Sequence, residues 1–226
     1  ADADLILANG AGYETWMDTA TLPPGKVVYT AEGLDLIQME GETHSHGPEG
    51  EHAHGGADPH TWTDPNLFIQ QAEVVVEELI RIDPDHAEAY STGLAQLIPA
   101  LQELDEEYRE AFEEMDEDAA LAANHPAYNY LARRYGVPIV SFALDPNEVS
   151  SEEEIEEVSR WQREVLRPVM FWEEPPTPEV QTSLPGNIRH VFVDPLEQPP
   201  EQGEYDYMDQ AEANVSRLRD ALTVTD

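Results

Sequence analysis

The stretch AALAANHPAYNYLARRYGVPIVSF, residues 119–142, decides the fold. It begins with the small apolar run Ala119–Ala123, continues through a helical pattern at Ala127–Tyr135, and ends in a second apolar run at Val137–Phe142. A strand, a helix and a strand in close succession predict a β-α-β unit, in which the two strands run parallel. In such sheets ligands bind beyond the carboxyl ends of the strands.

The same alternation continues to the end of the chain. Ser151-Glu152-Glu153-Glu154 has the pattern of a capping box and predicts the start of a helix that runs to Leu166. Strands that alternate with helices indicate a parallel sheet covered on both faces. The remaining expected elements are strands at Val169–Trp172 and His190–Val193, and helices at Glu179–Leu184 and Tyr207–Leu222.

The first half also mixes strands and helices. Apolar runs predict strands at Leu5–Ala8 and Val27–Tyr29, and the spacing of apolar residues predicts a helix over Asn66–Ile82. From His86 to Met115 the apolar residues recur in steps of three and four, which predicts one helix of ~45 Å. A helix of this length would span more than one small domain.

The charge of the chain is strongly negative. It has 48 acidic and 11 basic residues, for a formal net charge of −37. Nucleic acid is excluded as an expected partner, because binding it needs a basic face. Two explanations of the acidity remain open and are compatible: adaptation to a saline medium, and electrostatic attraction of cations.

Two classes of feature are missing from the sequence. Without cysteines it has no disulfides, no thiolate zinc site and no cysteine nucleophile. No apolar run approaches the ~20 residues that a membrane helix needs, and no signal peptide is present.

The opening Ala-Asp-Ala-Asp-Leu-Ile-Leu resembles the end of a helix running into a strand. We therefore expect the natural protein to begin further upstream.

Histidines gather in the segment THSHGPEGEHAHGGADPHTWTDP, residues 43–65. His60 stands between two Asp-Pro steps, where the chain is stiff. Neutral imidazole is the commonest protein ligand of zinc. We expect the other four histidines of the segment to lie in an irregular loop over residues 41–57 and to bind metal weakly: His44, His46, His52 and His54.

Two further candidate ligands follow predicted strands. His125 comes after the strand 119–123 and Asp194 after the strand 190–193. Together with His60 they would supply two imidazoles and a carboxylate to a divalent cation. Each also has a structural explanation, since a histidine or an aspartate after a strand is commonly a cap. Glu173 and Glu174 follow a strand too, and are expected to be solvated.

Several motifs, in order, resemble the zinc/manganese ABC-transporter substrate-binding proteins, the ZnuA-like family. The early segments Asn9-Gly10 and Glu14-Thr15-Trp16-Met17 resemble its first lobe, and Asp58–Pro65 resembles its DPHxWxDP motif. Asn124–Leu131 resembles its second-lobe histidine motif. Phe171-Trp172-Glu173 and Val193-Asp194-Pro195-Leu196 match later segments.

The resemblance implies an α/β fold with two Rossmann-like lobes and parallel sheets, joined by a long rigid helix. We expect residues 1–85 to form the first lobe, residues 86–116 the connecting helix and residues 117–226 the second lobe. The first lobe would be incomplete, because the family begins with a further strand–helix–strand region that carries another histidine ligand. Affinity would then rest on three protein ligands.

The resemblance also implies a function. His60, His125 and Asp194 would hold Zn²⁺ between the lobes for delivery to an ABC permease, from a periplasmic or membrane-anchored position. The protein would act as a monomer and would not be an enzyme. Histidine at position 125 favours zinc over Mn²⁺. Two alternatives stay open: a manganese receptor or adhesin of the same fold, and a zinc-dependent hydrolase with Glu173 as its base.

Overall fold

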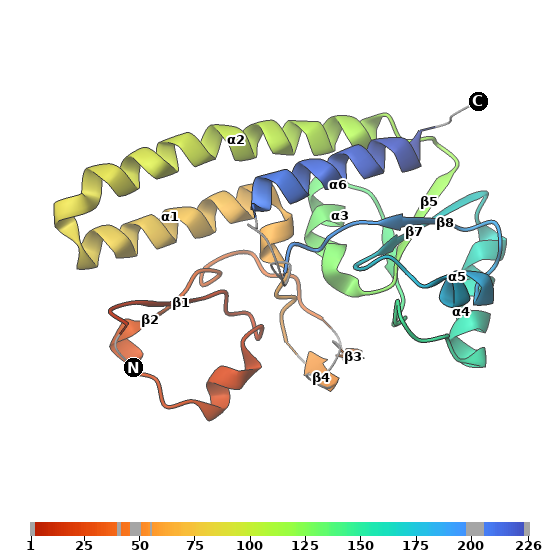
Figure 1. Cartoon of the computed structure of the whole chain (residues 1–226), viewed down its shortest axis with the longest axis horizontal. Helices are drawn as coiled ribbons and strands as arrows, with labels where there is room; N and C mark the ends of the chain where they lie inside the picture. The colour runs from red at the N-terminus through yellow and green to blue at the C-terminus, as the bar shows by residue number, and fades with distance from the viewer. Residues whose placement is uncertain (1–2, 40–41, 46–50, 55, 198–205, 224–226) are drawn as a thin grey trace. The chain divides into compact units, whose positions relative to one another are not determined.

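The computed structural model describes residues 3–39, 42–45, 51–54, 56–197 and 206–223. The chain divides into two compact units, Ala1–Asp105 and Glu106–Asp226. The boundary falls inside the long helix α2, Ala87–Glu113 (Figure 1), which confirms the helix expected over residues 86–115. The division into two lobes and a separate connector stays a prediction. In the described part of the chain, no helix is both long and apolar enough to cross a membrane.

The second unit is built on a parallel sheet of four strands in the order β6-β5-β7-β8. Each strand lies where the sequence predicts one. The strand β7 pairs with both β5 and β8, and its five residues from Pro168 to Trp172 are buried. The four strands are β5 (Ala119–Ala123), β6 (Ile139–Ser141), β7 (Arg167–Trp172) and β8 (Arg189–Phe192).

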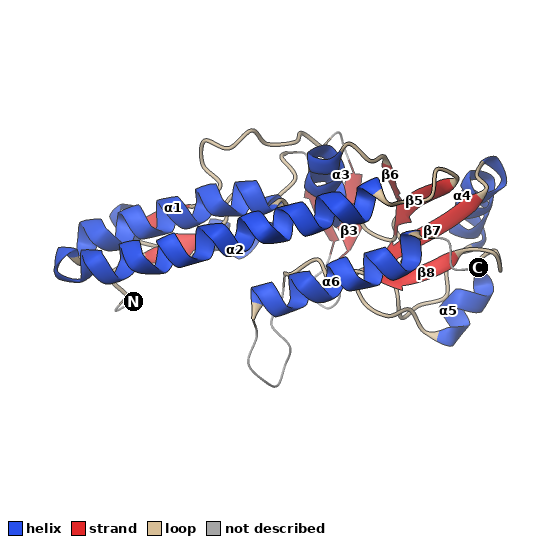
Figure 2. Cartoon of the chain, turned by 90° about the horizontal axis from the view of Figure 1, so that it is seen from above, coloured by secondary structure: helices blue, strands red, loops and turns tan. Residues whose placement is uncertain are grey.

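Helices cover both faces of this sheet, with α4 and α5 on one side and α6 on the other (Figures 1 and 2). Side chains alternate along β7, as the pleat requires. Met170 and Trp172 share a buried cluster with Val158 of α4 and Val180 of α5. The helices and turn of this unit are η6 (Pro126–Tyr128), α3 (Asn129–Tyr135), α4 (Glu152–Glu164), α5 (Pro178–Ser183) and α6 (Tyr207–Leu222).

The opposite face of β7 points toward η6 and α6. The ring of Phe171 meets the ring of Tyr128 edge-on, with centroids 5.7 Å apart. Phe171 and Trp172 are both fully buried, so truncating either to alanine would cost about 3–5 kcal/mol. This rigid core fixes the carboxyl ends of the strands. The capping box expected at Ser151 is present, with Glu154 accepting from the Ser151 backbone at 2.6 Å.

The first unit contains a parallel pair of strands, β1 (Ile6–Ala8) and β2 (Val27–Tyr29), as predicted. The helix α1 (Pro65–Ile82) has Asp64 as its N-cap, and the Asp64 side chain accepts from the backbone nitrogens of residues 66 and 67. Aspartate at the N-cap followed by proline at N1 is a strong start signal. Short 3₁₀ turns complete the unit: η1 (Thr15–Thr19), η2 (Pro24–Lys26), η4 (Thr61–Thr63) and η5 (Pro84–His86).

The histidine-rich segment is not the irregular loop that the sequence predicted. Residues Glu42–Ser45 (β3) and Glu51–His54 (β4) form an antiparallel pair in which His44 is opposite His52. The prediction weighed the glycines and Pro48 as signs of an irregular segment. The polar runs on either side instead pair as strands, and this pairing satisfies their backbone hydrogen-bonding groups. His46 lies outside the described residues.

Candidate metal-binding site

His60 is held rigidly inside the first unit. Its side chain is almost fully buried, and Nδ1 lies 2.6 Å from Oδ1 of Asp58. The backbone nitrogen of His60 donates to the same oxygen at 2.9 Å. Asp58 is itself buried and its backbone nitrogen donates to Ile37. A carboxylate on Nδ1 favours the tautomer that presents Nε2 as the lone-pair donor to a metal.

A polar network attaches this turn to the end of β1. Asn9, the residue after β1, donates to the carbonyl of Pro59 at 2.9 Å. Its Oδ1 accepts from Gln71 of α1 at 2.8 Å and lies 3.1 Å from the hydroxyl of Thr61. The backbone nitrogen of Asn9 donates to Glu14 at 2.6 Å. Satisfied polar networks rigidify a site, so these partly buried contacts tie the turn that carries His60 to the end of β1.

Aromatic rings pack beside the imidazole. The ring of Trp62 meets His60 edge-on with centroids 5.5 Å apart, and Tyr13 meets Trp62 at 5.0 Å. Such edge contacts fix ring orientation. The tryptophan of the Asp58–Pro65 motif therefore limits rotation of the His60 ring.

His125 follows β5 in the second unit, as predicted, and is buried. Its Nδ1 lies 3.2 Å from Oε2 of Glu173, the residue after β7. Asn124 holds the same glutamate: its amide nitrogen donates to Oε1 at 3.2 Å, and its Oδ1 accepts from the Glu173 backbone at 3.0 Å. Asn124 also donates to the carbonyl of Leu144 at 2.9 Å. Asn124 therefore holds the carboxylate of Glu173 within ion-pair distance of the imidazole.

The expectation that Glu173 is a solvated strand-end residue is wrong. Its side chain is only 23% exposed because it lies between Asn124 and His125. Its neighbour Glu174 is exposed, as expected, and contacts Asn147 at 3.3 Å. The partners of Glu173 are distant in sequence, so only the parallel pairing of β5 with β7 brings them together.

Asp194 follows β8 at the same carboxyl edge of the sheet as His125. Its backbone is fixed by Asn214 of α6, which accepts from the Asp194 nitrogen at 2.9 Å and donates to its carbonyl at 2.7 Å. Oδ1 of Asp194 accepts from the nitrogen of Leu196 at 2.8 Å. Burial raises the pKa of Asp194, and that hydrogen bond and the positive charge of Arg217 act in the opposite direction.

Glu197 is a candidate ligand that the sequence reasoning missed. A carboxylate oxygen of Glu197 and a ring nitrogen of His125 lie within 4.8 Å of each other. Leu196 takes a positive φ of 62°, unusual for a residue other than glycine. This turn follows Asp194-Pro195 and carries the chain to Glu197. The signal was the Asp-Pro-Leu-Glu sequence, of which only the first three residues were considered.

The predicted ligands are thus distributed over both units. His60 belongs to the first unit, and His125 and Asp194 to the second. Within the second unit, Glu197 offers a ligand atom within 4.8 Å of a ring nitrogen of His125, and Asp194 belongs to no cluster of three or more metal-ligand atoms among the described residues. Three of the four auxiliary histidines lie on the β3–β4 hairpin: His44, His52 and His54.

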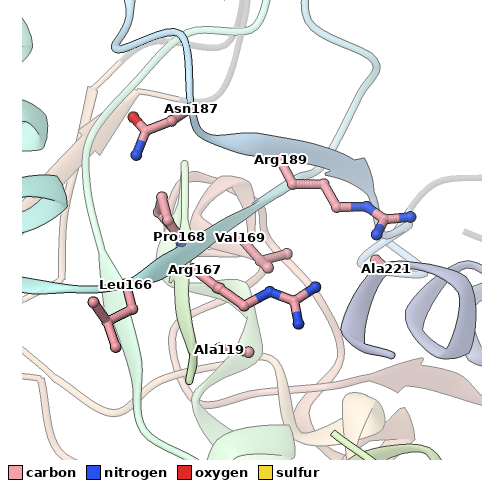
Figure 3. A pocket seen from close by; sticks show the side chains of 8 residues that line it. All are labelled: Ala119, Leu166, Arg167, Pro168, Val169, Asn187, Arg189 and Ala221. Atoms are coloured by element: carbon pink, nitrogen blue, oxygen red, sulfur yellow. The ribbon is translucent and has the colours of Figure 1, made fainter. Parts of the chain in front are cut away.

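A pocket of ≈ 170 Å³ lies at the amino-terminal ends of the strands in the four-stranded sheet of the second unit (Figure 3). The guanidinium groups of Arg167 and Arg189 extend in the same direction there. Arg167 pairs with Asp116, and Arg189 donates to the carbonyl of Asp220 at 2.6 Å. Both arginines therefore anchor chain segments, at the edge of the sheet opposite to His125.

These features define a class of protein: it has α/β units, and two buried histidines, each close to a carboxylate, lie immediately before short helical turns. Comparison with known families identifies it further. A model of the family "Zinc-uptake complex component A periplasmic" matches residues 1–221. The chain belongs to this ZnuA family, whose members are substrate-binding proteins of metal ABC transporters rather than enzymes.

Relatives carry names for both metals. The High-affinity zinc uptake system protein ZnuA of Bacillus subtilis is 29% identical over 99% of this chain and 73% of its own length. The Manganese ABC transporter substrate-binding lipoprotein PsaA of Streptococcus mitis is 25% identical, covering 98% of this chain and 74% of its own. The family thus includes proteins named for zinc and for manganese.

Solved structures confirm the predicted α/β fold class. The metal-dependent lipoprotein YcdH of Bacillus subtilis superposes with a TM-score of 0.81 at 27% identity, covering 99% of this chain and 82% of that structure. The Zn(II)-bound ZnuA-like domain of Streptococcus pneumoniae AdcA gives a TM-score of 0.78 at 24% identity, with 98% and 80% covered. The chain therefore shares its α/β fold with both structures.

Proposed function

We propose that this chain is an extracytoplasmic receptor that captures Zn²⁺ and delivers it to an ABC permease in the membrane. The observation that carries the proposal is a carboxylate oxygen close to Nδ1 of each predicted histidine ligand, at 2.6 Å for His60 and 3.2 Å for His125. Asp58 serves His60, and Glu173 serves His125. Histidines that bind metal generally donate their other ring nitrogen to such a partner.

The proposed ligands of zinc are His60, His125 and Asp194, with Glu197 as a further carboxylate beside His125. Two imidazoles and one or two carboxylates suit the four-coordinate preference of Zn²⁺. The surplus of negative charge, −37 over the chain, favours accumulation of cations near the protein. We propose that the receptor acts as a monomer.

Manganese is the second candidate, because the carboxylates of Asp194 and Glu197 are hard ligands that suit Mn²⁺. Relatives named for manganese support keeping it. Imidazole nitrogen favours zinc, so the two histidines decide our preference. A hydrolase is not proposed, since Glu173, its required base, is already engaged by Asn124 and His125.

Calorimetric titration of the metal-stripped protein with Zn²⁺ at pH 7.5 tests the proposal. We expect one tight zinc per chain, and tighter binding of zinc than of manganese in competition. His60→Ala and His125→Ala should each weaken binding by more than the roughly 10–100-fold typical of losing an outer partner. His86→Ala is the matched control, because His86 is exposed and pairs with Asp83 on η5. Tight binding unaffected by either site variant would refute the proposal.

A further inference from the structure

The environment of Glu173 assigns it a role that no comparison gives. We infer that Glu173 is a positioning residue that fixes the tautomer of His125, so that Nε2 faces the metal. The inference rests on the proposed function for its consequence in zinc binding. The tautomer of His125 is inferred from the contacts of Glu173 alone and does not depend on zinc binding.

The two carboxylate oxygens of Glu173 have different neighbours. Oε1 accepts from the amide nitrogen of Asn124 at 3.2 Å, and Oε2 lies 3.2 Å from Nδ1 of His125. Asn124 is fully buried, and its other contacts, to the Leu144 carbonyl and the Glu173 backbone, fix the orientation of its amide. Oε1 is therefore held in place as an acceptor, and Oε2 lies within ion-pair distance of Nδ1 of His125.

The position of the proton on the His125 ring depends on Glu173. An ionised carboxylate only accepts hydrogen bonds, so Oε2 favours a proton on Nδ1 of His125. A neutral imidazole with its proton on Nδ1 has its lone pair on Nε2. That nitrogen can then bind a cation without first changing tautomer. Glu173 thus prepares His125 before the metal arrives.

Glu173→Gln should invert the tautomer of His125. Asn124 donates to the Oε1 position and will keep the amide oxygen of glutamine there. The amide nitrogen then occupies the Oε2 position and donates to Nδ1 of His125. Nδ1 must accept, so the proton moves to Nε2, the nitrogen that the metal needs. An isosteric change therefore produces the wrong tautomer with little change in packing.

Nuclear magnetic resonance of the metal-free protein, labelled with ¹⁵N at histidine, tests the tautomer directly. Spectra are recorded at pH 8, and His125→Ala assigns the signal. We expect Nδ1–H for His125 in the wild-type protein and Nε2–H in Glu173→Gln. Observation of Nε2–H in the wild-type protein overturns the inference even if the variant does not fold.

Zinc calorimetry supplies the functional arm. Glu173→Gln should weaken binding roughly 10–100-fold, and Glu173→Asp, which keeps an acceptor-only carboxylate, should recover part of that loss. Glu174→Gln, the exposed neighbour, should bind as the wild type does. Thermal unfolding checks that the variants are folded.

The two failures can be told apart. If the wild-type protein binds no zinc, or if His125→Ala binds normally, the proposed function or its ligand set is wrong. If those tests succeed and Glu173→Gln binds zinc as tightly as the wild type with an unchanged His125 tautomer, only the positioning role is wrong.

Discussion

Oδ1 of Asp58 lies 2.6 Å from Nδ1 of His60 and also accepts the backbone N–H of that histidine at 2.9 Å. One buried oxygen therefore fixes both the ring and the main chain of the proposed ligand. Unlike the pairing of Glu173 with His125, this contact is local, and it is contained within the Asp58-Pro59-His60 sequence.

Asp58→Asn should weaken zinc binding by roughly 10–100-fold, as expected for an outer partner of a ligand. The asparagine oxygen can keep the backbone contact to His60, but the negative charge beside the ring is lost. Calorimetry measures the affinity. Asp85→Asn, on an exposed aspartate of η5, is the control, and equal affinities for the two variants would contradict the prediction.

Asp194→Asn and Glu197→Gln distinguish the two candidate carboxylates. We expect both to weaken zinc binding, because each removes a negative oxygen donor while preserving shape. In Asp194→Asn the Oδ1 contact to the Leu196 nitrogen can persist, so the turn should survive. The same titration with zinc reads out both variants.

Unchanged affinity in one of these two variants would remove that residue from the ligand set. Glu174→Gln serves as the control for loss of one charge from a protein with a net charge of −37. A comparable loss of affinity in this control would show that the effect is one of general electrostatics.

Removal of residues 43–54 should leave the tight zinc site intact and abolish only weaker equivalents. The chain on either side of this segment is already paired: Met39 donates to the carbonyl of Gly56 at 2.8 Å, and Asp58 donates to Ile37 at 2.8 Å. Shortening therefore leaves the anchor of His60 in place. Zinc stoichiometry from calorimetry or mass spectrometry provides the measurement, and loss of the tight equivalent would count against this division of roles.

Acid should destabilise the second unit partly through His190. The indole nitrogen of Trp172 donates to Nδ1 of His190 at 2.9 Å, so this ring is bound as a neutral acceptor. Burial lowers the pKa of His190 below its usual value near 6.5. The unfolded chain then binds the proton more readily, so stability is lost as the pH falls below about 6.5.

Urea unfolding of the wild-type protein and His190→Gln at pH 7.5 and 5.5 measures this effect. Glutamine offers Trp172 an acceptor that does not titrate, so the variant should lose less stability on acidification. His86→Gln, at an exposed histidine, controls for a general loss of titrating groups. Equal losses in the wild-type protein and His190→Gln would contradict the assignment.

Local patterns were enough to predict most of the fold. The structure contains the predicted strand Ala119–Ala123, the helix after it and the strand near Ile139. These elements were predictable because the spacing of apolar residues and the residues that end an element are local properties of the sequence. The hairpin β3–β4 was missed, since polar strands lack apolar alternation. The family resemblance indicated the α/β class with parallel sheets, which the structural comparisons confirm.

The site was predictable only in part. His60, His125 and Asp194 could be named from strand ends and motifs, and their role as ligands stays a proposal. Glu173 was misjudged because its partner, His125, is close only through the pairing of β5 with β7. Glu197 was not predicted as a ligand because it follows a turn with a positive φ at Leu196. The spacing of apolar residues in the sequence does not reveal such a turn.

The amide of Asn214 bonds both the N–H and the carbonyl of Asp194, as a neighbouring strand would. This side chain locks the turn after β8 to a single position on α6. A slip of α6 by one residue would carry that anchor ~1.5 Å along the helix axis. Metal sites tolerate errors of only about 0.5 Å. The position of the proposed ligand Asp194 therefore depends on where α6 lies along its own axis, although α6 supplies none of the proposed ligands.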